Sequence, residues 1–136
     1  MSVQNNNKAI NIGLWIAQAL LGLMFLMAGS MKTFQPVEAL VEALPWVANT
    51  PVALVKFIGI SELLGGLGLL LPSILRIKPF LTVWAAYGLV VVMVLAAAFH
   101  ASRGEFSAIG MNVVLIGLAA FIAWGRSKKA PIAARA

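Results

Sequence analysis

Residues 50–73 read TPVALVKFIGISELLGGLGLLLPS, and this stretch decides the fold. Its apolar part, at roughly 1.5 Å of rise per helical residue, is long enough to span a hydrocarbon core of about 30 Å. A single carboxylate, Glu62, interrupts it far from either end. A charged side chain at such depth is costly and rarely faces lipid. The stretch therefore predicts a transmembrane helix that buries an acid against other helices.

Three further apolar runs accompany it in a chain of 136 residues, of which 62% are hydrophobic and 10% charged. A soluble domain of this size would expose too much apolar surface at that ratio. The four predicted spans cover residues 10–31, 52–71, 80–100 and 108–124. Because each span must satisfy its backbone polar groups internally, helices are expected. We predict an all-α integral membrane protein, with residues 1–136 forming a single domain built as an antiparallel four-helix bundle.

The connections predict how the spans are joined. Most are short, which favours up-down-up-down topology. Pro72 and Pro79 bracket a basic turn and predict that one helix stops and the next restarts there. In the longest connection, residues 33–51, apolar side chains recur at helical spacing between Pro36 and Pro45. This spacing predicts a short interfacial helix between the first two spans, with an irregular loop as the alternative.

The net charge of +6 is unevenly distributed along the chain. One predicted side of the membrane, which holds both termini, carries seven basic residues and no acid. This bias predicts a bacterial-type inner membrane protein with both termini in the cytoplasm. Residues 125–136 then form a basic cytoplasmic tail that contacts anionic lipid, and no nucleic-acid partner is expected. The seven residues are Lys8, Arg76, Lys78, Arg126, Lys128, Lys129 and Arg135.

The first apolar run could also be read as a cleaved signal peptide, since residues 28–30 resemble a small-residue cleavage site. The run is longer than the roughly 7–15 residues of a signal core and three spans follow, so we predict a retained anchor. The chain contains no cysteine, which excludes disulfides and thiol catalysis within it. With one histidine and no cysteine, we also predict no metal or haem site.

The few polar residues of the spans predict a candidate ligand-binding site formed by Glu62, Lys32, His100 and Asn112. The last three each lie at or near the end of an apolar run on the predicted outer side. Their pairing is left open. A direct contact between Lys32 and Glu62 requires the second span to begin deeper than Val52, or a bridging water. Asn112, or His100 through Asn112, could meet the acid instead, and no catalytic residue is assigned.

Each of these residues also has a structural interpretation. Polar contacts between helices in lipid contribute about 0.6–2 kcal/mol, which hardly offsets the roughly 2.5–3.5 kcal/mol needed to insert a carboxylate, so a functional Glu62 is favoured. Lys32 is more often a snorkelling interfacial lysine, and Asn112 an interhelical hydrogen bonder. His100 could be inert or could relay protons. Four tryptophans are interpreted as interfacial belts: Trp15, Trp46, Trp84 and Trp124.

Small and polar residues share helical faces with the candidate site. One stripe on the first span ends at Lys32, and another on the second span passes through Glu62. Glycines on such faces let neighbouring backbones approach closely. We predict that both faces pack helices and line a ligand. Their members are Gln18, Gly22, Gly29, Gly59 and Gly66.

Four short motifs together resemble the DoxX and DoxX-like family of small four-helix membrane proteins. They are FLMAGSMKT at 25–33, with the family's Ala-Gly-x-x-Lys pattern, GISELLGGLGLLLP at 59–72, MVLAAAFH at 93–100, and Asn112. The family includes a small subunit of a thiosulfate:quinone oxidoreductase and components of oxidative-stress assemblies. The resemblance therefore implies a quinone- or redox-linked membrane function.

Three functions remain open on the sequence. The first is binding of a quinone or a similar lipid-soluble ligand within a redox-linked membrane system. No electron-carrying cofactor is evident, so a redox partner protein would be needed and enzyme activity is left open. The second is a non-catalytic scaffold or assembly partner, and the third is a small transporter or proton pathway. Four helices leave little lumen, so the third would call for a homo-oligomer.

Overall fold

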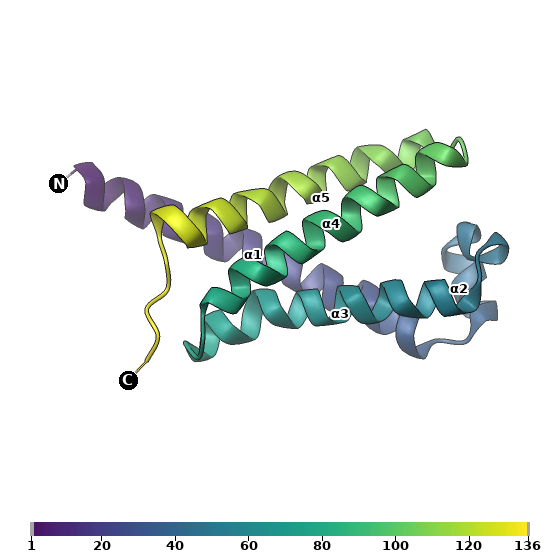
Figure 1. Ribbon diagram of the computed structural model, residues 1–136, viewed down its shortest axis with the longest axis horizontal. Helices are drawn as coiled ribbons and strands as arrows, with labels where there is room; N and C mark the ends of the chain where they lie inside the picture. Colours follow the sequence, from purple (N-terminus) through teal and green to yellow (C-terminus); the bar gives the residue numbers. More distant parts are fainter. Residues whose placement is uncertain (1, 136) are drawn as a thin grey trace.

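The computed structural model describes residues 2–135 of the chain, and all regular structure in that range is helical (Figure 1). In the described range, four helices are long and apolar enough to cross a membrane, namely α1, α3, α4 and α5. This confirms the predicted fold class. The elements are α1 (Ser2–Phe34), α2 (Val37–Ala43), the 3-10 helix η1 (Pro45–Asn49), α3 (Val52–Leu75), α4 (Phe80–Ser102), α5 (Phe106–Trp124) and the π-helical turn η2 (Gly125–Lys129).

The long helices form two antiparallel pairs, α1 with α3 and α4 with α5 (Figure 1). α3 and α4 also pack together and lie close at the turn that joins them, residues 76–79. From that turn the two pairs diverge toward the end of the bundle that carries α2 (Figure 1). The helix pairs therefore lie close together at one end of the bundle and farther apart at the other.

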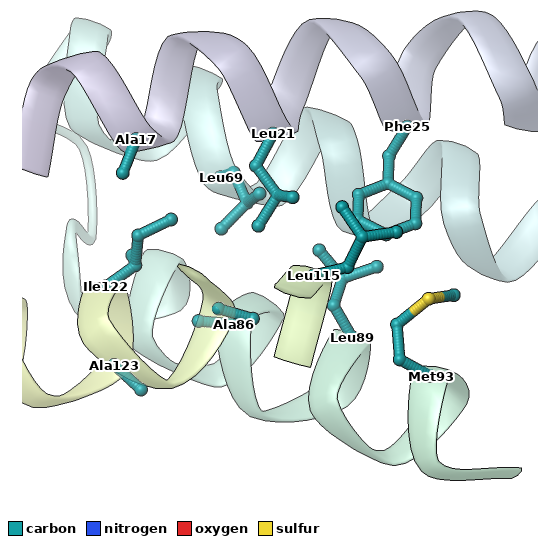
Figure 2. Packing of buried hydrophobic residues seen from close by; sticks show 11 residues of the cluster. Ala17, Leu21, Phe25, Leu69, Ala86, Leu89, Met93, Leu115, Ile122 and Ala123 are labelled. Carbon is teal, nitrogen blue, oxygen red and sulfur yellow. The ribbon is translucent and has the colours of Figure 1, made fainter. Parts of the chain in front are cut away.

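An apolar core fills the centre of the bundle (Figure 2). Leu21 of α1, Leu69 of α3, Leu89 of α4 and Ile122 of α5 are each almost completely buried. Toward the α2 end the core continues through side chains that include Phe25. This layer forms the floor of the space between the helix pairs.

The closest helix contact is between α1 and α3, and glycines make it possible. A Cβ atom at Gly29 would lie 2.5 Å from the backbone nitrogen of Leu63, and one at Gly59 would lie 2.6 Å from the Cβ atom of Lys32. A larger side chain at either position would meet the facing helix. The glycine faces predicted from the sequence are thus the surfaces along which α1 and α3 touch.

Pro72 does not end a helix, contrary to the sequence expectation. α3 continues through it to Leu75 and ends where Arg76 adopts a left-handed conformation, with φ of 56°. A proline inside a transmembrane helix is tolerated when a neighbouring helix satisfies the freed backbone groups. Pro72 leaves the carbonyl of Gly68 without its intrahelical donor, and Gln18 of α1 donates a hydrogen bond to the adjacent carbonyl, that of Leu69, at 2.7 Å.

The connection between α1 and α3 folds over the open end of the bundle. The predicted short helix is present as α2, and the chain continues directly into η1. Leu40 of α2 and Val47 of η1 are buried in a small apolar cluster with Val55 of α3. This cluster fixes η1 beside the space between the helix pairs.

Candidate functional site

A cavity of about 430 Å³ lies at the α2 end of the bundle, bounded by both helix pairs and by η1. We call it the Glu62 cavity. Its walls are mostly apolar, with Phe25 of α1, Phe57 of α3 and Phe99 of α4 among them. All four predicted site residues line it as well: Lys32, Glu62, His100 and Asn112.

Lys32 and Glu62 form a direct ion pair in this cavity. The Lys32 ammonium nitrogen lies 2.8 Å from Oε1 and 3.0 Å from Oε2 of the carboxylate. The side chains are 12% and 4% exposed, respectively. Lys32 therefore points inward and does not snorkel, and it provides the counter-charge that a carboxylate at this depth needs.

This contact forms although α3 begins at Val52, where the sequence predicted the span to start. The sequence argument assumed that the ends of α1 and α3 are level, but they are not. Lys56, one turn into α3, donates a hydrogen bond to the backbone oxygen of Thr33 at 2.9 Å, and Lys32 packs beside Gly59. Lys32 is therefore only three residues, or about 4.5 Å along the axis, above Glu62.

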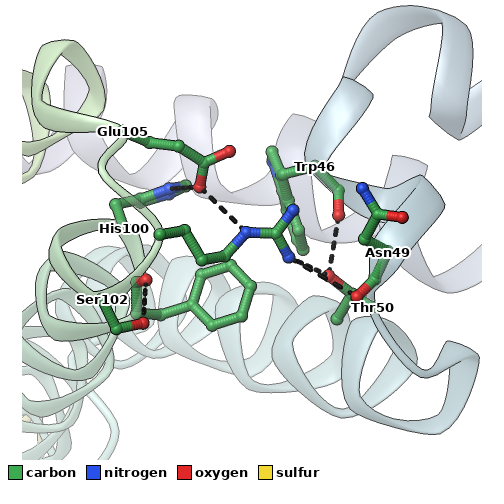
Figure 3. Close-up of polar contacts among 8 residues, drawn as sticks. Trp46, Asn49, Thr50, His100, Ser102 and Glu105 are labelled. Atoms are coloured by element: carbon green, nitrogen blue, oxygen red, sulfur yellow. Dashed lines mark hydrogen bonds and ion pairs between the residues drawn. The ribbon is translucent and has the colours of Figure 1, made fainter.

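His100 lies at the rim of the cavity and pairs with Glu105, not with Glu62. Its Nδ1 atom is 3.0 Å from Oε1 of Glu105 (Figure 3). The imidazole also makes edge contacts with the rings of Phe99 and Trp46, at centroid distances of 5.5 and 6.2 Å. Arg103 joins the group at 3.4 Å from the same Glu105 oxygen. His100 is thus held by a rim cluster that links α4 to η1.

Asn112 is buried in the first turns of α5 and lines the cavity. Its side-chain nitrogen Nδ2 has no hydrogen-bond partner among the described residues. An unpaired buried donor costs about 1–3 kcal/mol, and such groups in native proteins call for an explanation. A ligand with an acceptor group in the Glu62 cavity would supply the missing partner.

A second buried polar cluster lies near the opposite end of the bundle, and we call it the Gln18 network. Gln18 donates to Ser73 Oγ at 3.1 Å, and Ser73 shares a 2.6 Å hydrogen bond with Thr82. The Gln18 side-chain oxygen accepts a 2.6 Å bond from Nε of Arg126, whose Nη1 also donates to Asn11 at 2.6 Å. The network links α1, α3, α4 and η2.

The position of Arg126 differs from the sequence expectation. It was assigned to a basic tail, yet it is 4% exposed, and its guanidinium stacks 5.1 Å from the centre of the Trp15 ring. Helical structure continues past Trp124 as η2, and Gly125 lets Leu14 pack closely against this turn. A Cβ atom at Gly125 would lie 2.5 Å from the Leu14 side chain, so a larger residue there would require Leu14 to move.

The small residues predicted to line the ligand site occupy other positions. Gly22, Gly29, Gly59 and Gly66 lie in the contact between α1 and α3, where facing backbone or side chains already fill the space. Gln18 belongs to the Gln18 network. The Glu62 cavity is lined instead by larger apolar side chains.

The sequence-based predictions did not place Trp46, Glu105 or Arg126 at a buried polar site. For Glu105 and Arg126, the sequence does contain a signal. Trp46 was interpreted as part of an interfacial belt but lines the cavity, with the Lys32 ammonium 5.9 Å from its ring centre. Glu105 follows His100 closely enough for a helix-ending turn to bring the two together. Arg126 continues the buried face of α5 at alternating spacings of three and four, after Asn112, Leu115, Ala119 and Ile122.

No group of three or more His, Cys, Asp or Glu side chains within residues 2–135 is arranged to hold a metal ion. At the Glu62 cavity, two acids and the histidine form pairs instead: Lys32 with Glu62, and His100 with Glu105. The polar groups that line the Glu62 cavity include an ion pair, an imidazole and an amide.

Comparison with known proteins identifies the family of the chain. The model of the DoxX-like family matches residues 16–122, which include every residue of the Glu62 cavity. No curated protein and no solved structure matches the chain. The family match covers most of the sequence, and the chain belongs to the DoxX-like family.

Proposed function

We propose that this DoxX-like membrane protein binds a quinone, or a lipid-soluble ligand with a similar head group, in the Glu62 cavity. One observation carries the proposal: a largely apolar cavity holds a buried ion pair beside an amide donor, Asn112 Nδ2, that lacks a partner. Apolar walls with a few convergent polar groups are typical of small-molecule sites.

The cavity offers two hydrogen-bond donors, one for each carbonyl oxygen of a quinone ring. An ammonium group has three hydrogens to donate, and Lys32 uses two directions toward the Glu62 oxygens. The third is free for a ligand oxygen. Asn112 Nδ2 supplies a second donor. Lys32 would also stabilise negative charge that develops on the ring during reduction.

The apolar tail of such a ligand has a route to the bilayer between α3 and α4. Leu54 and Phe57 on α3 and Leu95 on α4 line the cavity and are 40%, 68% and 64% exposed. Side chains that face both the cavity and the outside mark its lateral opening. A volume of about 430 Å³ accommodates a head group, within the roughly 300–1,000 Å³ of ligand pockets.

The proposed redox role requires a second protein. Reduction of a quinone to a quinol takes up two electrons and two protons, and a redox partner would supply the electrons. Glu62 and His100 are the groups at the cavity that could exchange protons. Under the positive-inside rule, the cavity lies in the outer half of a bacterial inner membrane, with both termini in the cytoplasm.

The test is mass spectrometry of organic extracts from gently solubilised protein. We expect a quinone in the extract of the wild type and its loss in Glu62→Gln. Glu42→Gln makes the same chemical change on the exposed face of α2 and should retain the ligand. Extracts of the wild type without any quinone would contradict the proposal.

A scaffold function is favoured by a different feature, the outer face of α5. Gly110 and Gly117 lie there, and a Cβ atom at either would meet no other group within 4 Å. Small residues on a lipid-facing surface permit another helix to pack closely. Under this alternative, crosslinking recovers one stoichiometric partner or a second copy of the chain. Leucine at Gly110 then abolishes the complex, while Glu62→Gln leaves it intact.

A further inference from the structure

Arg126 is a buried cation whose bonding partners are all neutral. Its guanidinium donates to Gln18 Oε1 and Asn11 Oδ1, each at 2.6 Å, and to the backbone oxygen of Ala130 at 2.8 Å. The remaining nitrogen, Nη2, is buried and has no hydrogen-bond partner among the described side chains, those of residues 7–135. Buried charges in proteins are normally paired with a group of opposite charge.

The side chains of this protein cannot provide that group. The sequence has four acidic residues, and all of them lie toward the α2 end of the bundle: Glu38, Glu42, Glu62 and Glu105. Around Arg126, in contrast, the chain carries further cations on the 76–79 turn, on η2 and in the following segment. A counter-charge for Arg126 would therefore have to come from outside these side chains.

A second cavity, of about 560 Å³, lies directly beside Arg126, and we call it the Trp84 groove. One wall is the first half of α4, where Phe80, Trp84 and Tyr87 are largely exposed. The other wall is the segment after η2, including Pro131 and Ile132. A hydrogen bond of 2.9 Å from the backbone of Arg135 to that of Arg76 fastens this segment to the 76–79 turn.

We propose that the Trp84 groove is a binding site for a phosphate-type oxyanion, held by Arg126 and supplied by the head group of an acidic phospholipid. A guanidinium matches the geometry of phosphate oxygens and forms charge-assisted hydrogen bonds with them. Tryptophan and tyrosine side chains are characteristic of the head-group level of a bilayer. Their apolar surfaces would lie along the first part of an acyl chain, and the surrounding cations attract anionic lipid.

The experiment measures the thermal unfolding midpoint of the purified full-length protein in a neutral detergent with added lipid. Phosphatidylglycerol should raise the midpoint of the wild type, and phosphatidylcholine at the same concentration should not. Arg126→Gln should lose this increment. The matched control is Lys128→Gln, which removes one exposed charge from the same turn and should keep the increment.

A parallel arm with inorganic phosphate identifies the source of the anion. An Arg126-dependent shift with phosphatidylglycerol alone assigns the site to lipid, and an equal shift with inorganic phosphate assigns the same oxyanion site to a soluble ion.

Arg126→Gln also removes bonds to Gln18 and Asn11, so native mass spectrometry of the wild type provides a test that does not depend on how the variant folds. We expect one phosphatidylglycerol to remain bound from an equimolar mixture with phosphatidylcholine. Equal retention of both lipids, or equal loss of the shift in Lys128→Gln, would overturn the proposal.

Discussion

The Glu62 cavity and the Gln18 network are both buried polar clusters, but they differ in what surrounds them. Around Gln18, hydrogen bonds of 2.6–3.1 Å connect α1, α3, α4 and η2, and the Trp84 groove lies at the edge of this network, beside Arg126. Around Glu62, an ion pair adjoins a cavity of about 430 Å³, and Asn112 lacks a partner. Buried polar groups in a membrane protein can hold helices together or hold a ligand. Gln18, Ser73 and Thr82 bond to groups of neighbouring helices, whereas the amide of Asn112 faces a cavity without such a partner in the described part of the chain.

This comparison predicts opposite responses to substitution in the two regions. Changes in the Gln18 network should lower stability and leave retention of the ligand in the Glu62 cavity intact. Changes in the Glu62 cavity should abolish ligand retention and alter stability little. The four substitutions below test this contrast, beginning with a position on which the Glu62 cavity depends for its shape.

Gly29→Leu should have the largest effect. Its side chain would collide with the backbone of α3 at Leu63, so α1 and α3 must separate and Lys32 loses its contact with Glu62. Overpacking against backbone costs about 3 kcal/mol or more. A thermal melt in detergent should show the loss, whereas the control Gly117→Leu, which meets open space, should melt like the wild type. An unchanged midpoint for Gly29→Leu would disprove the close α1–α3 contact.

Gln18→Leu should destabilise the protein by roughly 2–3 kcal/mol, because it removes hydrogen bonds to the buried guanidinium of Arg126 and to the hydroxyl group of Ser73. The measurement is again the unfolding midpoint, combined with mass spectrometry of retained ligand. Gln35→Leu makes the same change at an exposed position near the end of α1 and serves as the control. Loss of ligand from Gln18→Leu at a temperature where it is still folded would remove the distinction between the two regions.

Glu62→Gln should lower stability by only about 1–2 kcal/mol, in the range of polar contacts between membrane helices. The ammonium of Lys32 can either donate a hydrogen bond to the amide oxygen or extend toward the surface along its flexible stem. Ligand retention should nevertheless be lost. The unfolding midpoint measures the change in stability, and mass spectrometry of an organic extract from the same preparation measures ligand retention. A drop in stability as large as that of Gln18→Leu would indicate that Glu62 serves only to hold helices together.

Asn112→Leu should have the smallest effect on folding, with a midpoint equal to or slightly above that of the wild type. It removes a buried donor that has no partner, and this gains up to about 1 kcal/mol in the free protein. Titration with a short-chain quinone should show roughly three- to tenfold weaker binding, equivalent to one hydrogen bond. Asn49→Leu, at an exposed position of η1, is the control. Unchanged affinity in Asn112→Leu would exclude its amide from the site.

The sequence predicted the fold class and the short helix α2, because hydrophobic length and helical spacing are local properties. It also predicted four residues that line one cavity, because a membrane protein has few polar side chains and most lie near one end of the spans. The direct contact of Lys32 with Glu62 could not be predicted in this way. It depends on how far α1 slides along α3, which is set by the packing of Gly29 and Gly59.

The misplacement of Arg126 has a related cause. Positive charge near a span end indicates which side of the membrane the end occupies, but not whether the side chain turns inward. The inward position depends on the continuation of helical structure through η2 and on the close packing of Leu14 against Gly125. The spacing of Arg126 from Ile122 on α5 was the available signal. Arg126 follows Ile122 by four residues, so it continues the buried face of α5 beyond Ile122.

The most direct test of the central claim is an experimental structure of the protein in lipid discs prepared with the membrane extract of its host. We expect density for a ring-shaped head group in the Glu62 cavity, with one oxygen within hydrogen-bond distance of Asn112 Nδ2 and another near the Lys32 ammonium. Its tail should pass between Phe57 and Leu95 into the lipid. A cavity that holds only water, or one closed by contact of α3 with α4, would contradict the assignment of these residues to a ligand.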